Sequence, residues 1–328
     1  MKKSMWFFLF TLVASTMITL SSNNWVSMWM GLELNMMSFI PIILNKNNKS
    51  SAEAGMIYFL IQSVSSMMLM FMIMMIMIKY MMPNYIMNTV ITISILMKLG
   101  AAPFHMWMPE MLSKINWYKS MILMSWQKMA PLMMMSNMNT NNIMINCAIL
   151  MSVIIGSLGG INQTSLRKLM GYSSINHLGW MLAINKNINM WMLYFMIYSV
   201  MIMIVCQTFN KMKIYFINQV GSVNMNSPSK IILFIMMLSM GGLPPFIGFL
   251  PKWIVIQEMI NSSEVFMMFI MVMFSLVTLM FYIRTMTNMF LLQNSSIKWI
   301  QPYKMNMNMF INLLVNMSLP MILIMDIL

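Results

Sequence analysis

The stretch VFMMFIMVMFSLVTLMFY, residues 265–282, contains no charged residue, no glycine and no proline. With its uncharged flanks it grows to about 20 residues, enough for a helix to cross a hydrocarbon layer of roughly 30 Å. Similar stretches recur at 67–78, 143–158 and 190–206. They lack the alternation of barrel strands, and only helices or closed barrels satisfy every backbone group in lipid. The sequence therefore predicts an all-α, polytopic membrane helical bundle.

Composition excludes several other classes of protein. Of the 328 residues, 60% are hydrophobic and 8% are charged, which is too little charge to cover a soluble domain. The net charge of +13 comes mainly from cations in short loops between apolar spans. This distribution is typical of residues that set the orientation of a protein in the membrane, and not of a surface that binds nucleic acid. Cys147 and Cys206 form no Cys-x-x-Cys pair, and the 57 methionines show no ligand spacing, so neither predicts a metal site.

Clusters of Asn, Pro, Lys and Ser divide the chain into about eleven predicted spans. The spans are 4–21, 24–44, 53–78, 85–107, 119–137, 142–159, 165–184, 189–209, 229–258, 265–290 and 306–326.

Loop charges support that count. If the N-terminus lies on a side called side A, and the chain changes side after each span, 13 cations fall on side A and two on the opposite side. The 13 are Lys2, Lys3, Lys46, Lys49, Lys114, Lys119, Arg167, Lys168, Lys211, Lys213, Lys230, Lys298 and Lys304, and the two are Lys79 and Lys186. The positive-inside rule then places the N-terminus on the cytoplasmic or equivalent side and the C-terminus, with Asp326, opposite.

Four ionisable residues remain near the middle of the predicted membrane: Glu33, Lys98, Lys128 and Lys252. An unpaired charge there costs several kcal/mol, so such groups are rare and line a wet or paired interior. A static ion pair that fixes helix registry is one reading. One carboxylate cannot serve three lysines, however, and desolvation favours the neutral amine, so we favour proton exchange.

Two of these lysines accompany clusters of glycine and proline. Lys98 begins KLGAAPFH, residues 98–105, and Lys252 ends GGLPPFIGFLPK, residues 241–252. Glycine and proline inside a span interrupt the helix. Two broken helices in different halves are typical of transporters built from inverted repeats. We expect such repeats at 24–159 and 165–326, within a single domain covering 1–328; simple packing kinks are the alternative for either segment alone.

Both histidines, His105 and His177, fall in or beside these spans. A lone histidine in a helix is more often a packing residue than a ligand, and two cannot complete a metal site. Beside a row of buried lysines, an imidazole is also a candidate proton carrier. Ser173, Ser174 and Asn176 are candidates for holding bridging water, whereas Glu53 and Glu110 are interpreted as solvated acids at the interface.

Six motifs stand in an order that resembles a known family. They are WMGLELN (29–35), residues 98–110, WQKMAP (126–131), GINQT (160–164), residues 172–180 and residues 241–253. Together they resemble NADH dehydrogenase subunit 2 of animal mitochondria, most closely the insect forms, in the antiporter-like family of respiratory complex I subunits. One departure is Ile57, where relatives often have a lysine.

The resemblance implies a role for each candidate site residue. Glu33 matches a glutamate that pairs with the lysine of the first broken helix, here Lys98. Lys128 matches a lysine on the central axis, and Lys252 matches the lysine of the second broken helix. His105 and His177 match histidines proposed to bridge the lysines.

The resemblance also implies a proton-translocating core subunit of NADH:ubiquinone oxidoreductase in the mitochondrial inner membrane, with its N-terminus in the matrix and its C-terminus in the intermembrane space. The chain would be part of an enzyme but carry no redox centre, metal or cofactor, because NADH, FMN, iron–sulfur clusters and ubiquinone would bind partner subunits. Its partners would be other membrane subunits, including antiporter-like ones, and lipids. A monovalent cation/proton antiporter subunit and a non-conducting structural spacer remain the alternatives.

Overall fold

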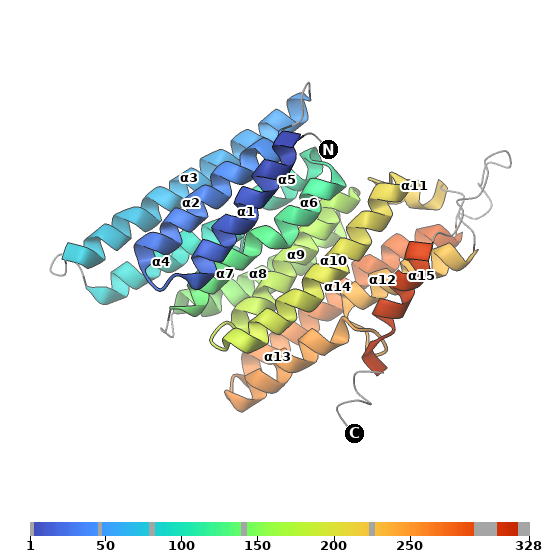
Figure 1. Ribbon diagram of the computed structural model, residues 1–328. Coiled ribbons are helices and arrows are strands. Elements are labelled where there is room, and N and C mark those ends of the chain that lie inside the picture. The colour runs from blue at the N-terminus through green and yellow to red at the C-terminus, as the bar shows by residue number, and fades with distance from the viewer. Residues whose placement is uncertain are drawn as a thin grey trace.

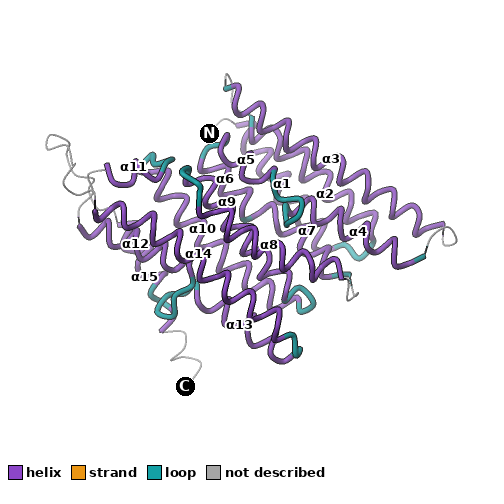
Figure 2. The backbone as a smooth tube through the Cα atoms, turned by 180° about the vertical axis from the view of Figure 1, so that it is seen from behind, coloured by secondary structure: helices purple, strands orange, loops and turns teal. Residues whose placement is uncertain are grey.

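The computed structural model describes residues 3–44, 48–78, 83–138, 143–222, 227–291 and 307–320. Within these ranges the regular structure is helical, apart from one isolated bridge between Ser165 and Phe216. The helices are α1 (Lys3–Ser21), α2 (Trp25–Ile43), α3 (Lys49–Ile78), α4 (Asn84–Leu99), α5 (Trp107–Lys114), α6 (Trp117–Met124), α7 (Trp126–Ser136), α8 (Ile143–Ile161), α9 (Leu166–Ala183), α10 (Ile188–Met212), α11 (Ile217–Ser222), α12 (Ser227–Gly241), α13 (Phe249–Asn261), α14 (Val265–Leu291) and α15 (Met307–Asn316). They lie side by side in one slab, with α3 at one edge and α12 and α15 toward the other (Figure 1 and Figure 2). The predicted all-α bundle is confirmed.

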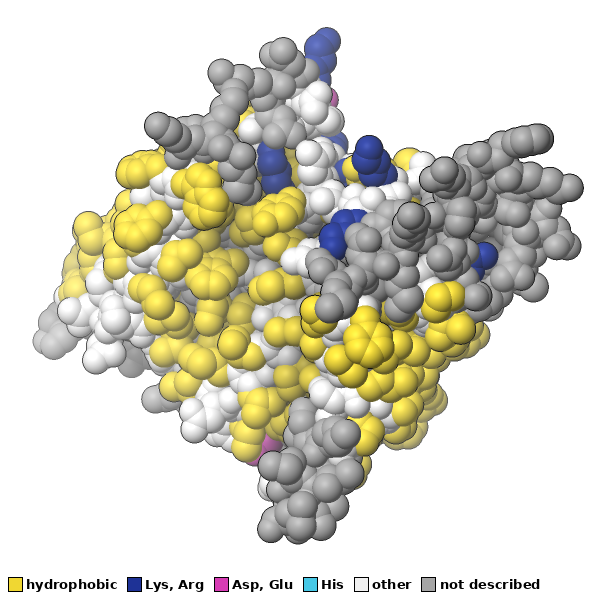
Figure 3. Space-filling view, turned by 45° about the vertical axis from the view of Figure 1, so that its right-hand side comes forward, with side chains coloured by type: hydrophobic (Ala, Val, Ile, Leu, Met, Phe, Trp, Pro, Cys, Tyr) yellow, Lys and Arg dark blue, Asp and Glu magenta, His cyan; other side chains and the backbone are white. Residues whose placement is uncertain are grey.

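The surface of the slab is suited to lipid. Among the described residues, five helical segments are long and apolar enough to cross a membrane: α2, α3, α8, α10 and residues 265–287 of α14. Figure 3 shows hydrophobic side chains over the middle of one face, with Lys and Arg gathered toward one end. The count of eleven spans stays a prediction, because the last predicted span continues past Pro320 into residues outside the described part. Six of the charged residues used in the sequence analysis also lie outside the described part: Lys2, Lys46, Lys79, Lys298, Lys304 and Asp326.

The two predicted broken helices are present. Residues 100–106 separate α4 from α5, and residues 242–248 separate α12 from α13. Each break begins with a glycine in the left-handed region, Gly100 at φ 68° and Gly242 at φ 76°, where a side chain would be strained. Prolines that follow in both breaks lack the N–H that would continue the helix. The predicted span 229–258 therefore contains parts of two helices, α12 and α13, whereas the predicted span 85–107 contains α4 and the break and ends at the first residue of α5.

A third interruption was not predicted. The span 119–137 is divided into α6 and α7 at Ser125, whose backbone lies outside the helical region at φ −105° and ψ −83°. The Ser125 hydroxyl donates to the Met121 carbonyl at 2.7 Å. Neither glycine nor proline marks this position, since Pro131 lies inside α7. Its consequence is that Lys128 occupies the first turn of α7.

Helix α9 lies in the interior of the slab. It packs against α5, α6, α8, α10, α13 and α14, and most of its side chains are buried. It is also the helix that carries Ser173, Ser174, Asn176 and His177 within little more than one turn. Because its neighbours are helices and not lipid, these polar groups can be accommodated at membrane depth.

Small residues let α8 and α9 approach closely. A Cβ on Gly156 would lie 2.6 Å from the backbone nitrogen of Asn176, and a Cβ on Gly179 would lie 2.5 Å from the Ser152 hydroxyl oxygen. Lipid supplies no hydrophobic drive for helix association, so close backbone contact between small residues is the main source of packing energy.

We expect Gly156→Ala to destabilise the bundle by about 1–3 kcal/mol, because the backbone of α9 cannot move aside as a flexible side chain could. The measurement is the thermal midpoint of the purified complex that contains the variant. Gly55→Ala is the matched control, since its Cβ would meet only the tip of Leu44 at 3.3 Å. Equal midpoints for the two variants would contradict this account of the α8–α9 contact.

Candidate functional site

Lys98 lies in the last turn of α4, immediately before the first break, and is 6% exposed. The break removes the amide that would normally bond to the Lys98 carbonyl, and the Gln62 side-chain amide donates to that carbonyl at 3.2 Å. Lys98 and Lys128 line the same cavity of about 20 Å³, together with Asn35, Tyr58, Gln62 and Gln127. A polar cavity of this size has room for about one water molecule.

A hydrogen-bonded chain of buried side chains crosses three helices beside this cavity. The Tyr58 hydroxyl donates to Gln127 Oε1 at 3.2 Å, and Gln127 Nε2 donates to Asn35 Oδ1 at 3.1 Å. All three residues are at most 9% exposed. Sequence reasoning did not select them or Gln62. The available signals were the helical i, i+4 spacing of Tyr58 and Gln62 and the position of Gln127 beside Lys128.

Glu33 lies on α2 and forms no ion pair or hydrogen bond with Lys98 in the described part of the chain. Its Oε1 atom is buried without a hydrogen-bond partner. Its neighbours on α2, Leu32 and Asn35, line the cavity of Lys98, which places Glu33 close to that cavity. In this conformation Glu33 is therefore near the Lys98 cavity without forming a direct contact with the ammonium.

Lys128 is 2% exposed in the first turn of α7. Its ammonium donates to the Ser174 carbonyl at 3.0 Å and to the Tyr198 hydroxyl at 3.4 Å. The same nitrogen lies 5.4 Å from the centre of the Tyr198 ring. Lys128 is thus held by neutral acceptors on α9 and α10, with no carboxylate beside it among the described residues.

His177 lies on α9 one turn after Ser174, which accepts from Lys128, and one turn before Trp180, whose ring lies 5.7 Å from the Lys252 ammonium. Its Nδ1 atom is 2.8 Å from the Tyr194 hydroxyl, and its ring centre is 4.9 Å from that of Tyr198. Since Tyr198 also contacts Lys128, a continuous run of polar groups leads from Lys128 to His177. Tyr194 and Tyr198 were not selected from the sequence, because tyrosine on an apolar helix is ordinarily a packing residue.

Lys252 is 5% exposed, in the first turn of α13 after the second break. Its ammonium donates to the Gly241 carbonyl at 2.7 Å, at the C-terminal end of α12. That end of a helix carries partial negative charge, which stabilises a cation. The Lys252 side chain fills the space where a side chain on Gly242 would stand, since a Cβ there would be 2.8 Å from Lys252 Cδ.

His105 is set apart from these residues. It lies in the first break, with Nδ1 3.2 Å from the Pro103 carbonyl oxygen and its ring centre 6.3 Å from that of Tyr172. Among the described residues, no hydrogen bond joins it to a lysine or to His177. The structure therefore brings Lys98 and Lys128 to one cavity and His177 between Lys128 and Lys252, but leaves His105 at the side.

Among the described residues, no group of three or more His, Cys, Asp and Glu side chains could hold a metal ion. The only ion pair formed by described residues joins Lys114 to Glu53 and lies away from the lysine row, at the end of the bundle where α3 and α9 begin. Around the lysine row, the described residues supply amines, imidazole, hydroxyls, amides and the carboxylate of Glu33. Such groups can pass protons by exchanging hydrogen-bond roles.

Comparison with known proteins identifies the family. Residues 22–278 match the family described as NADH:quinone oxidoreductase/Mrp antiporter, TM. The NADH-ubiquinone oxidoreductase chain 2 of Anopheles gambiae is 44% identical over 310 residues, covering 92% of this chain and 90% of that one. The protein of the same name from Locusta migratoria is 39% identical, covering 91% and 89%.

Solved structures agree in fold. A chain of respiratory complex I from Thermus thermophilus superposes with a TM-score of 0.85 at 15% identity, covering 97% of this chain and 78% of that one. A chain of the Mrp complex from a Dietzia species gives 0.75 at 12% identity, covering 91% and 61%. The buried lysines and broken helices described above therefore belong to a member of the NADH-ubiquinone oxidoreductase chain 2 family, within the antiporter-like membrane subunits.

Proposed function

We propose that this chain is a proton-translocating membrane subunit of respiratory NADH:ubiquinone oxidoreductase, located in the mitochondrial inner membrane. The observation that supports this most is the burial of Lys98, Lys128 and Lys252, with a polar cavity between the first two and polar side chains leading from Lys128 to His177. The N-terminus would face the matrix and the C-terminus the intermembrane space, as the loop charges favour. Similarity to chain 2 proteins supports the assignment to this complex.

The proposed mechanism is electrostatic gating of Lys98 by Glu33. At an effective dielectric constant near 20, one unit charge at about 4 Å is worth roughly 4 kcal/mol. Approach of the Glu33 carboxylate would favour the ammonium form of Lys98, and its withdrawal would favour the neutral amine. A proton released from Lys98 would then pass toward Lys128 by way of the cavity and the side chains of Tyr58, Gln127 and Asn35.

Beyond Lys128, the proposed route continues through Tyr198 and His177 to Lys252. Lys128 contacts Tyr198, and Tyr198 contacts His177, while the step from His177 to Lys252 would need bridging water. The energy must enter from outside the chain, through electron transfer from NADH to ubiquinone in partner subunits that hold FMN and iron–sulfur clusters. Within the enzyme this chain would move protons and carry no redox centre or cofactor of its own.

The two broken helices also support the proposed division into inverted repeats at 24–159 and 165–326. Each break starts at a left-handed glycine and has a buried lysine beside it, Lys98 before the first and Lys252 after the second. Repeats related by a two-fold axis keep the same chain order, so the matching breaks support the division, whereas the opposite order of lysine and break does not. Residues 321–326 of the second repeat lie outside the described part.

A monovalent cation/proton antiporter is the second candidate function, because the fold also matches a chain of an Mrp complex. In vesicles that contain the complex, proton uptake that requires sodium would favour this alternative. A structural spacer, the third possibility, is tested by the variants below, since a spacer would tolerate loss of the buried lysines.

We expect Lys98→Met and Lys128→Met each to abolish or uncouple proton pumping, because methionine keeps the bulk of the side chain but cannot hold a proton. The measurement is the number of protons moved per electron by the complex in sealed vesicles. Lys186→Met is the control, because Lys186 is exposed in the loop before α10. The complex with this variant should pump protons at the normal ratio. A normal ratio in both buried-lysine variants would refute the proposal.

We expect Gln127→Leu to slow proton-coupled turnover by about tenfold, because it leaves Tyr58 and Asn35 without their shared partner at a cost near 1–3 kcal/mol. The rate of vesicle acidification during NADH oxidation measures this effect. Gln207→Leu makes the same chemical change at an exposed position of α10 and should leave the rate unchanged. If the Gln127 variant acidifies vesicles at the wild-type rate, as the Gln207 control should, the hydrogen-bonded side chains of Tyr58, Gln127 and Asn35 are not part of the proton path.

A further inference from the structure

A second cavity, of about 330 Å³, opens at the end of the bundle where α3, α6 and α9 begin. Its lining includes Ser50, Lys114, Asn116, Arg167, Tyr215 and Phe216. The cavity is separate from the lysine row, and the proposed function gives it no role. Its donors and charges indicate what kind of ligand it fits.

Arg167 lines this cavity and is held in place by two contacts. One terminal nitrogen donates to the Ile115 carbonyl at 2.6 Å, and the guanidinium carbon lies 4.8 Å from the centre of the Tyr215 ring. Its Nε–H is shielded from solvent and has no hydrogen-bond partner. A guanidinium that is fixed on two sides at the wall of a cavity is well arranged to bind a phosphate or carboxylate oxygen.

The helix ends add positive potential at the same place. Asn116 and Ser165, the residues before α6 and α9, make no side-chain hydrogen bond to the first turn of their helices. Amides in an uncapped first turn attract anions, but the Leu166 amide of α9 already donates to the Tyr215 carbonyl at 2.9 Å, so the start of α6 is the freer end. The combination of the Arg167 guanidinium, Lys114 and the uncapped start of α6 favours an anionic ligand with several oxygens.

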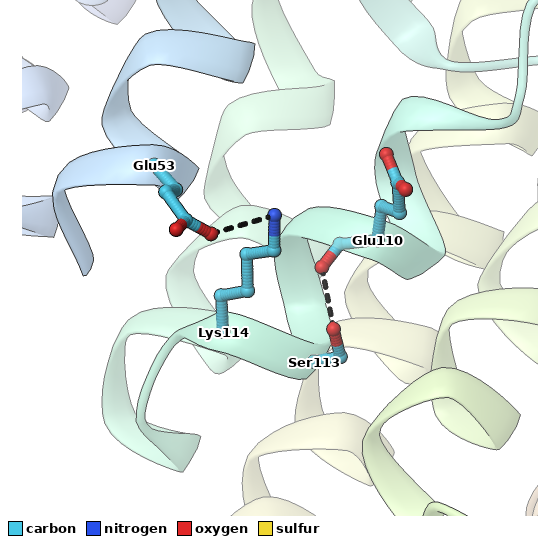
Figure 4. A network of polar contacts seen from close by, with 4 residues as sticks. All are labelled: Glu53, Glu110, Ser113 and Lys114. Carbon is cyan, nitrogen blue, oxygen red and sulfur yellow. Dashed lines mark hydrogen bonds and ion pairs between the residues drawn. The ribbon is translucent and has the colours of Figure 1, made fainter. Parts of the chain in front are cut away.

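The nearby carboxylates of Glu53 and Glu110 do not occupy the place of this anionic ligand. Glu53 reaches from α3 to Lys114 at 3.1 Å, while the carboxylate of Glu110 is turned away from that ammonium (Figure 4). The Glu53 and Lys114 side chains are 62% and 28% exposed, and an ion pair so open to solvent contributes little. A phosphate could therefore share or displace Glu53 at Lys114 at small cost.

The rim of the cavity indicates where such a phosphate would come from. Phe216 lines the cavity and is 47% exposed, beside Tyr215 and the two cations. Aromatic rings together with Lys and Arg are typical of the headgroup level of a membrane. We propose that this cavity binds the phosphodiester headgroup of an anionic phospholipid, with its phosphate oxygens on Arg167 and Lys114 and its glycerol and upper acyl chain against Phe216.

The test uses the whole complex reconstituted in phosphatidylcholine vesicles that contain phosphatidylglycerol with a photoreactive diazirine in its acyl chain. After irradiation, the yield of label is measured on peptides covering residues 107–119 and 213–222. We expect Arg167→Gln to lower this yield by about tenfold, the effect of losing one charged hydrogen bond. Lys211→Gln is the matched control, since it removes an exposed cation of α10 that does not line the cavity.

Competition separates the sources of the anion. Unlabelled phosphatidylglycerol should suppress labelling, whereas additional phosphatidylcholine and inorganic phosphate should not. Suppression by inorganic phosphate alone would show a free-phosphate site and overturn the lipid assignment. Equal labelling of the Arg167 and Lys211 variants would overturn the site itself. If Arg167→Gln does not assemble, Lys114→Gln, which keeps the Arg167 contact with Ile115, must show the same loss for the proposal to stand.

Discussion

The cost of placing an ammonium group in a low-dielectric interior governs how this protein is built. Lys98, Lys128 and Lys252 are each at most 6% exposed, and one carboxylate cannot balance three cations. Polar groups from the protein must therefore replace the water that each lysine loses. Lys128 and Lys252 find neutral backbone carbonyls, at Ser174 and Gly241, and Lys98 faces the polar cavity. An amine held by neutral acceptors can lose its proton without leaving a carboxylate unpaired, so this manner of burial is compatible with proton exchange.

Broken helices make some of these backbone groups available, although the Ser174 carbonyl belongs to the unbroken α9. An intact helix uses its carbonyls internally, whereas the break after Gly241 leaves a carbonyl for Lys252, and the break after Leu99 leaves the Lys98 carbonyl for Gln62. The interruption at Ser125 places Lys128 in the first turn of α7, facing α9 and α10. Irregular backbone is tolerated at membrane depth only where other helices cover it. The polar α9 therefore lies inside the slab, and the apolar α2, α3 and α14 supply much of the exposed surface.

Much of this could be predicted from the sequence, for reasons tied to particular residues. Long uncharged stretches such as 265–282 predict helices, and the glycine and proline clusters at 98–105 and 241–252 predict the two breaks. Lys98, Lys128, Lys252 and His177 stood out because charge and imidazole are rare in apolar spans.

The interruption at Ser125 could not be predicted, because no residue there forbids a helix. Tyr58, Asn35, Gln127 and Tyr198 were missed because their roles come from contacts between helices far apart in the chain. The direct Glu33–Lys98 pairing implied by the resemblance is not formed in this conformation.

The central claim is that water and polar side chains join the buried lysines into one route. The most direct measurement is a density map of the intact complex at a resolution that shows ordered water. We predict at least one water in the cavity between Lys98 and Lys128, within hydrogen-bond distance of Gln127 or Tyr58, and a hydrogen-bonded connection from Lys128 through Tyr198 and His177 to Lys252. A dry cavity, with apolar side chains separating the lysines, would contradict the account.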